Sequence, residues 1–311
     1  MATAQSATSE ALEQHRRELT GYCYRMLGSA FEAEDAVQET MLRAWRSLDR
    51  FEGRSALKSW LYRIATNVCF DALAGREKRA RPMDLGPAQE PLLENLAELP
   101  EVTWITPLPT PDELAEQRET LRLAFVAALQ HLPPKQRAAL ILCEVLRWPA
   151  SEAAELLETS VASVNSALQR ARATLAKVDT SAASELDDEA RALLERYVDA
   201  FEAYDIDRLT DLLHEDAVQS MPPISMWLRG RDDIFTWWFG PGIGCKGSKL
   251  VPVGLVNGMP GWGQYKPSPE GGREPWALIV PEVSEGRIVE LTFFLDTQRL
   301  FPLFELPDRL A

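Results

Sequence analysis

Residues 32–45 read EAEDAVQETMLRAW, and residues 59–73 read SWLYRIATNVCFDAL. In both stretches apolar residues recur at the 3.6-residue spacing that places them on one face of an α-helix. A preceding set has the same spacing: Leu12, His15, Leu19, Tyr22, Cys23, Met26 and Leu27. Gly28-Ser29 and Gly53 separate the three segments, as turn residues do. The first 80 residues are therefore predicted to form a compact bundle of helices.

The two quoted helices differ in the polar residues that they present. In the first, Asp35, Gln38 and Glu39 are spaced i, i+3 and i+4, so they share one exposed face. Taken alone, such a face is most simply a solvated helix surface. In the second, Trp60 and Ile64 lie on the apolar stripe, which favours packing in the core.

Beyond the bundle the character of the sequence changes twice. Residues 82–112 contain seven prolines, which indicates an extended, poorly helical linker. Helical spacing returns from Glu113, and Pro133-Pro134 opens a further helix, since proline is tolerated in a first turn. After Ser181–Ser184, two helices lead into strand-like runs at residues 249–257, 262–266, 275–283 and 287–296, which indicates an α+β domain.

Residues 151–177 have the pattern of a helix-turn-helix. Ser151 is predicted to cap a short helix over 152–158, and Ser160 to cap a second helix after the turn Thr159-Ser160. The second helix has an apolar stripe, and its other face can hydrogen-bond base edges or phosphates. The residues on that face are Asn165, Ser166, Gln169, Arg170 and Arg172. A solvated amphipathic helix is the alternative interpretation of this segment.

Composition and charge exclude several classes of protein. No apolar run approaches the ~20 residues that span a bilayer, and no secretion signal opens the chain, so we expect a cytoplasmic protein without membrane contact. The four cysteines and three histidines are scattered, which predicts no disulfide, metal site or cofactor. The net charge of −14 is unevenly distributed: residues 1–81 carry +2, residues 82–180 carry −6 and residues 181–311 carry −10. Local basic patches in the first two parts leave DNA binding open, because phosphate contacts act over about 10 Å.

The ordered set of motifs resembles the extracytoplasmic-function group of the sigma-70 family. The acidic and glutamine-bearing helix ends in an aromatic residue, Trp45, and the second stretch reads W-L-x-x-I-A-x-N-x-x-x-D. The resemblance implies a multidomain chain of two all-α sigma domains, a helical bundle and a helix-turn-helix, followed by an α+β domain. The implied boundaries are 10–81 for sigma domain 2, 82–112 for the linker, 113–178 for sigma domain 4 and 185–305 for the last domain. The implied function is promoter recognition and initiation with core RNA polymerase.

The resemblance also implies roles for individual residues. Asp35, Gln38 and Glu39 correspond to positions that bind core polymerase. Positions that contact promoter DNA at the −10 element correspond to Phe51, Asn67, Asp71, Arg76, Lys78, Arg79 and Arg81, of which Phe51 and Asn67 would capture a flipped base. For the −35 element the predicted set is Asn165, Ser166, Gln169, Arg170 and Arg172. Many relatives have a basic residue where this chain has Ala74, Asn165 and Ala167, which predicts weaker and more salt-tolerant DNA binding.

Residues 185–305 resemble a SnoaL-like α+β cone, and we expect this domain to regulate the sigma domains. Such cones enclose a pocket, here for a small hydrophobic ligand. Trp227, Trp237, Trp238 and Trp262 could line it, although packing in the core is the simpler role for them. His214, Asp216 and Asp296 would be the catalytic candidates, but helix and turn capping is the commoner use of such residues, so no catalytic residue is predicted.

Two other functions account for part of the sequence. A one-component regulator, with a helix-turn-helix and a ligand-binding domain, explains residues 151–311 and leaves residues 30–81 without a role. An enzyme built on the cone leaves residues 1–180 without a role. Stable association with core polymerase separates the first from a sigma factor, and turnover dependent on His214 or Asp216 separates the second.

Overall fold

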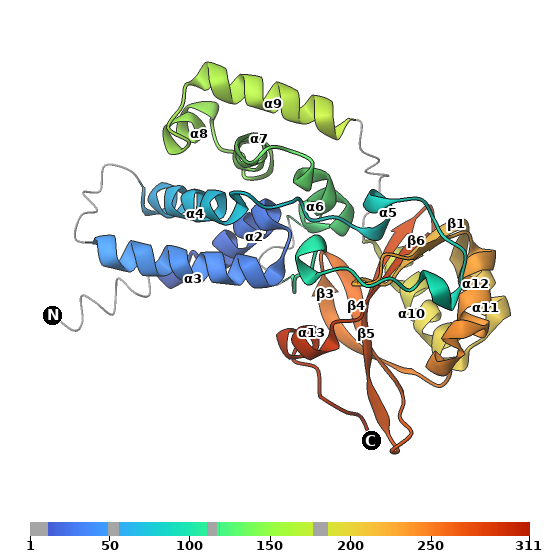
Figure 1. Cartoon of the computed structure of the whole chain (residues 1–311). Coiled ribbons are helices and arrows are strands. Elements are labelled where there is room, and N and C mark those ends of the chain that lie inside the picture. The colour runs from blue at the N-terminus through green and yellow to red at the C-terminus, as the bar shows by residue number, and fades with distance from the viewer. Residues whose placement is uncertain (1–11, 49–55, 111–116, 118, 177–185) are drawn as a thin grey trace. The chain divides into compact units, whose positions relative to one another are not determined.

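The computed structural model describes residues 12–48, 56–110, 117, 119–176 and 186–311. These residues form two compact units (Figure 1). The helical unit contains the described residues up to 79 together with those from 117 to 176. The α+β unit contains residues 80–110 and 186–311.

The helical unit contains the predicted bundle and the predicted helix-turn-helix. Its elements are α2 (Arg16–Leu27), α3 (Ala30–Ser47), α4 (Leu57–Leu73), α6 (Leu123–Gln130), α7 (Pro134–Leu140), a π-helical turn (Ile141–Val145), α8 (Ala150–Leu156) and α9 (Val161–Leu175). Gly28 ends α2 with φ of 71°, a left-handed conformation that glycine adopts without strain, and Ser29 caps α3 by accepting from the amide of Glu32. Pro134 opens α7 as predicted.

The core of the helical unit joins its two parts. The hydroxyls of Tyr22 and Thr66 lie 2.7 Å apart within the bundle, and the rings of Tyr22 and Tyr62 are 5.1 Å apart. Tyr62 also packs on Trp148, beyond α7, with ring centroids 5.1 Å apart. The chain from 12 to 79 and the chain from 119 to 176 therefore share a hydrophobic core.

The α+β unit is built on a six-stranded sheet with the order β2-β1-β6-β5-β4-β3. The strands are β1 (Leu213–Ser220), β2 (Trp227–Arg229), β3 (Lys249–Val256), β4 (Met259–Pro267), β5 (Arg273–Ser284) and β6 (Arg287–Phe294). The helices are α10 (Asp188–Ala203), α11 (Ile206–Leu212), α12 (Arg231–Phe239), a 3-10 turn (Pro241–Cys245) and α13 (Thr297–Leu303). Helices α11 and α12 pack on β1, α10 on β3 and α13 on β5, and Figure 1 shows α10, α11 and α12 grouped beside the sheet.

The sheet differs from the expected run of antiparallel strands in one respect. Strand β1 pairs with β6 in parallel, and the other neighbouring strands pair antiparallel, so the sheet is mixed. The sequence pattern did not predict β1, because its residues LHEDAVQS alternate poorly and it is buried mainly at its two ends.

Residues 80–110, which we call the connecting segment, run along the α+β unit. They include α5 (Pro82–Leu85) and single 3-10 turns at Leu93–Asn95 and Glu101–Thr103, and are otherwise extended. Two isolated bridges join the segment to the rest of the unit, Glu98 with Ile224 and Pro109 with Val256, and a third joins Ala80 with Trp104 inside the segment. Trp104, Ile105 and Leu108 of the segment are buried. The proline-rich stretch that the sequence marks as a linker is thus packed as part of the α+β unit.

Candidate functional site

A hollow of about 310 Å³ lies between α3 and α4 of the helical unit. Trp60, Ile64 and Asn67 line it at i, i+4 and i+7 of α4, and Arg43, Arg46 and Ser47 of α3 complete it. Asn67 is exposed, whereas Trp60 and Ile64 are half-buried. Trp60 and Ile64 are therefore walls of this hollow and not the core side chains that their spacing suggested. The hollow therefore offers an aromatic wall, an exposed amide and two guanidinium groups. This combination can bind an unstacked nucleic-acid base and its phosphate.

Of the other residues predicted for this surface, Asp71 lies on α4 and is joined to α3 by Arg43. The guanidinium of Arg43 donates to Glu39 at 2.7 Å and to Asp71 at 3.4 Å. The side chain of Asp71 is 70% exposed, so this ion pair adds little stability. Phe51 lies outside the described residues. That Arg43 and Arg46 also line the hollow was not predicted from the sequence, because the other lining residues there belong to another helix, α4.

The polar face of α3 is arranged as its spacing predicts. Asp35 and Gln38 are exposed and Glu39 is half-buried. The Gln38 amide donates to Glu34 at 3.3 Å, and the Asp35 and Glu39 side chains border a shallow hollow with Arg76 of the following segment. The face is accessible to a partner of opposite charge.

The basic cluster at residues 76–81 is not one continuous patch. Arg76 and Arg79 both donate to Glu32, the latter at 3.0 Å, and only 6% of the Arg79 side chain is exposed. The ammonium of Lys78 lies 3.1 Å from Nδ1 of His131. Arg81 belongs to the α+β unit, where it forms ion pairs with Asp84 at 3.4 Å and Glu290 at 3.7 Å. Arg76 and Lys78 are exposed, whereas phosphate contact by Arg79 or Arg81 requires them to leave carboxylate partners.

Helices α8 and α9 form the helix-turn-helix. Ser160 caps α9 and accepts from the amide of Ser163 at 3.1 Å, as predicted. Ser151 does not cap α8, because that helix already begins at Ala150 after Pro149. The predicted face of α9 is exposed along its length: Asn165, Ser166, Gln169, Arg170 and Arg172. Arg172 also donates to Glu144 at 2.6 Å, which fixes α9 to the π-helical turn.

Replacing Ser160 with alanine is expected to lower the free energy of unfolding by about 1 kcal/mol, because the first turn of α9 loses its side-chain cap. Urea denaturation of the full-length protein measures the change. Ser166 is the matched control, since it is exposed on α9 beyond the first turn that Ser160 caps. Equal losses for the two alanine variants would show that the cap contributes nothing.

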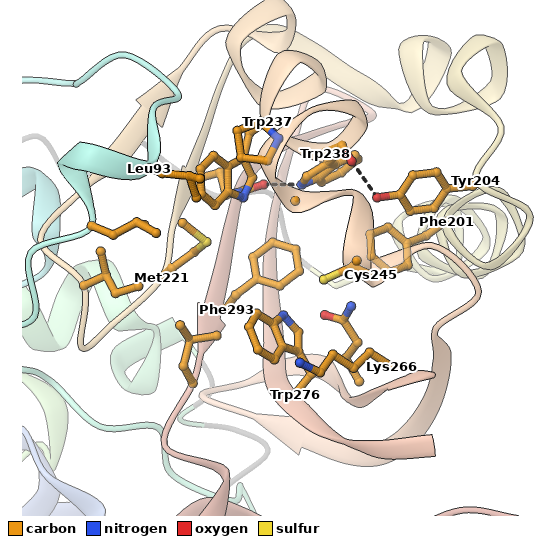
Figure 2. A pocket seen from close by; sticks show the side chains of 18 residues that line it. Leu93, Phe201, Tyr204, Met221, Trp237, Trp238, Cys245, Lys266, Trp276 and Phe293 are labelled. Carbon is orange, nitrogen blue, oxygen red and sulfur yellow. Dashed lines mark hydrogen bonds between the residues drawn. The ribbon is translucent and has the colours of Figure 1, made fainter. Parts of the chain in front are cut away.

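The α+β unit contains a cavity of about 230 Å³, shown in Figure 2. Trp237, Trp238 and Trp276 line it, whereas Trp227 and Trp262 are buried elsewhere in the unit. The predicted ligand-lining role thus applies to two of the four tryptophans, and Trp276 was missed because its strand shows no clear alternation. His214, Asp216 and Asp296 are absent from the described residues that line the cavity. The ring of His214 instead accepts from the amide of Asp216 at 3.1 Å.

Known families match all three parts of the chain. The model described as Sigma-70 region 2 matches residues 11–79, Sigma-70, region 4 matches residues 122–175, and the SnoaL-like domain matches residues 194–248. These matches agree with the predicted order of two helical domains followed by an α+β domain. No helix in the described ranges is both long and apolar enough to cross a membrane.

Whole-chain similarity extends to two proteins of Mycobacterium tuberculosis. The ECF RNA polymerase sigma factor SigG is 45% identical over 96% of this chain and 83% of its own length. The ECF RNA polymerase sigma factor SigJ is 28% identical over 83% of this chain and 82% of its own length. The crystal structure of SigJ aligns with a TM-score of 0.63 at 24% identity, covering 93% of this chain and 95% of that one, which supports the shared fold.

Proposed function

Since this chain belongs to the extracytoplasmic-function (ECF) RNA polymerase sigma factors, we propose that the face of α3 binds core RNA polymerase and that the hollow on α4 and the face of α9 bind promoter DNA. The −10 element binds at the hollow, and the −35 element binds at α9. The protein performs no covalent chemistry in this role. The α+β unit regulates the two sigma domains, and its cavity holds a small, mainly apolar ligand.

The observation that supports this assignment best is the composition of the hollow on α4. It combines the Asn67 amide with an aromatic wall and two guanidinium groups, and it lies within the segment matched by Sigma-70 region 2. A repressor with only a helix-turn-helix would have no use for such a base-sized hollow. The enzyme alternative has less support, because His214, Asp216 and Asp296 are not among the described residues that line the cavity of the α+β unit.

The test is in vitro transcription with purified core polymerase, comparing the full-length protein with residues 1–181 on a genomic promoter library. We expect both proteins to direct initiation and to differ in level, because the shorter one lacks residues 186–311 of the α+β unit. Failure of both to bind core polymerase would exclude a sigma factor. Equal initiation by the two would exclude regulation by the α+β unit.

Reversing the charge of Asp35 is expected to weaken binding to core polymerase at least tenfold. The substitution Asp35→Arg puts a cation on the exposed acidic face, where it would meet the cations of a complementary surface. Each such contact between like charges costs about 1 kcal/mol or more. Fluorescence anisotropy of labelled protein titrated with core polymerase measures the affinity. Glu152→Arg is the matched control, because Glu152 is an exposed carboxylate of the helical unit that lies on α8 and not on the α3 face. Equal weakening by both would point to net charge and not to this face.

A further inference from the structure

We propose that the cavity of the α+β unit binds a neutral, ring-bearing small molecule with one hydroxyl donor, and that bound ligand fastens the connecting segment over the cavity. This inference rests on the regulatory role proposed above for the α+β unit and names the ligand class and the element that responds to it.

The walls of the cavity favour a flat ring. Besides the three tryptophans, the aromatic side chains of Phe201, Tyr204 and Phe293 surround it, and Figure 2 shows them arranged about a common space. Aromatic walls stack on rings and bury them at little entropic cost. An engineered cavity of about 150 Å³ holds benzene, so 230 Å³ accommodates a compound of one or two rings.

Among the described lining residues, one fully buried side-chain polar atom has no hydrogen-bond partner. The Tyr204 hydroxyl donates to the backbone oxygen of Trp238 at 2.8 Å, and the indole of Trp238 donates to Oε1 of Gln219 at 2.7 Å (Figure 2). Oε1 of Gln264 is different: the side chain is 1% exposed, and this oxygen accepts no hydrogen bond from any described residue. A buried acceptor without a donor is costly to retain, so a ligand that supplies the donor gains affinity.

The orientation of the Gln264 amide follows from its neighbour. The hydroxyl of Ser248 donates to the backbone oxygen of Cys245 at 2.6 Å. Its oxygen must therefore accept from Nε2 of Gln264, at 3.0 Å, which leaves Oε1 as the free acceptor. The ligand must bring a hydroxyl or N–H to this oxygen, and a hydroxyl on a ring is the simplest group that does so.

Charge in the cavity points to a neutral ligand. Lys266 is the one ionised side chain among the described lining residues, and its ammonium is already neutralised by Glu274 at 3.3 Å. The same ammonium lies 4.0 Å from the ring centroid of Trp276, which stabilises it further. Burial raises the pKa of the Cys245 thiol, so that group stays neutral as well. An anionic ligand would have to compete with Glu274 for Lys266.

The connecting segment forms part of the cavity wall. Leu93 and Leu96 of this segment line the cavity, and Figure 2 shows Leu93 beside Trp237. The side chain of Leu93 is nevertheless 64% exposed. This exposure is unfavourable for a leucine, and a ligand ring that packs against the side chain would reduce it. Ligand binding thus adds apolar contact to the part of the segment between two of its backbone hydrogen bonds to the rest of the unit. In these the amide of Gln89 donates to the oxygen of Trp227 and the amide of Leu99 to that of Pro223, both at 3.0 Å.

This arrangement links the ligand to transcription, because the connecting segment joins the part of the chain matched by region 2 to the part matched by region 4. A ligand that binds only when residues 89–99 are docked stabilises the docked segment. Ligand binding then reduces the number of undocked residues that link the two sigma domains. Ligand should therefore change initiation without contacting DNA or polymerase.

The first test uses 2-naphthol and 2-methoxynaphthalene as probes on the full-length protein, with tryptophan fluorescence as the readout. The two compounds share a ring system, but only 2-naphthol carries a donor. We expect saturable binding of both and about tenfold tighter binding of 2-naphthol, a preference that Gln264→Leu abolishes by weakening 2-naphthol alone. Absence of saturable binding by both probes, or an unchanged preference in the variant, would overturn the proposed site. Circular dichroism of the variant confirms that it is folded.

The second test follows the segment itself by amide hydrogen exchange. With 2-naphthol bound, the amides of Gln89 and Leu99 are expected to exchange about tenfold more slowly, while those of α9 stay unchanged. Unchanged exchange at residues 89–99 would overturn the link to the segment. These measurements need no polymerase, so their failure leaves promoter recognition intact. Conversely, a protein that binds the probe normally but never initiates transcription would count against the sigma function and not against the cavity.

Discussion

Replacing Asn67 with alanine should reduce promoter-dependent initiation by about ten- to a hundredfold while leaving binding to core polymerase unchanged. The amide carries a donor and an acceptor side by side, so it can make paired hydrogen bonds with the Watson–Crick edge of a captured base, and such paired contacts are worth about 1–3 kcal/mol each. The fold should not suffer, since Asn67 is exposed on α4 and alanine is the better helix former.

Two measurements on the same variant separate DNA capture from polymerase binding. Run-off transcription gives initiation, and anisotropy gives the affinity for core polymerase. Gln38→Ala is the matched control, because it removes an exposed amide from α3, on the face assigned to polymerase. It should weaken polymerase binding and initiate normally at saturating protein. If Asn67→Ala loses polymerase affinity to the same extent as initiation, the hollow is not a base-binding site.

The sequence predicted the elements of the helical unit well because its helices are long, periodic and bounded by glycine, serine and proline. Gly28, Ser29, Ser160 and Pro134 all occupy the positions at helix ends that their chemistry predicts. The motif positions on α3, α4 and α9 followed directly, since residues on one helix keep their spacing in the folded protein.

What the sequence could not predict depends on contacts between distant parts of the chain. The parallel pairing of β1 with β6 joins residues about seventy positions apart, and β1 has no strand pattern of its own. The proline content of residues 82–112 correctly excluded long helices but carries no information on what those residues pack against. Likewise, a run of cations at 76–81 looks like one basic patch, yet Arg79 is buried on Glu32 and Arg81 is paired with Glu290.

A second large effect is expected at Arg137, which joins the two parts of the helical unit. From α7 its guanidinium donates to the backbone oxygen of Met26 at the end of α2, to Oε1 of Gln130 at 2.6 Å and to the oxygen of Leu132 at 3.1 Å. The side chain is 3% exposed, and burial lowers the pKa of Arg137 to about 10. The charge is tolerated there because these oxygens surround it, and they lose their donor when the side chain is removed.

Arg137→Ala is therefore expected to lower the free energy of unfolding of the helical unit by about 3–5 kcal/mol, because several buried oxygens lose a charged donor and each such loss costs about 1–3 kcal/mol. Urea denaturation followed by far-ultraviolet circular dichroism reports on the helices, and Lys135→Ala, on an exposed position of α7, should change it by less than about 0.5 kcal/mol. A loss below about 1 kcal/mol for Arg137→Ala would mean that water replaces the guanidinium without penalty.

A variant of Arg25 tests the origin of this loss in the free energy of unfolding. The loss comes either from the contact between the two parts or from the second part alone. From α2 it donates to the backbone oxygen of Thr120 at 3.2 Å and to the hydroxyl of Thr120 at 2.7 Å, so it crosses the same boundary from the opposite side. If the boundary opens as a unit, Arg25→Ala has little left to break once Arg137 is gone, and the double variant should lose clearly less than the two single losses added together. Additive losses would mean that each arginine stabilises its own surroundings, and that the two parts of the helical unit stay joined by the hydrophobic contact of Tyr62 with Trp148.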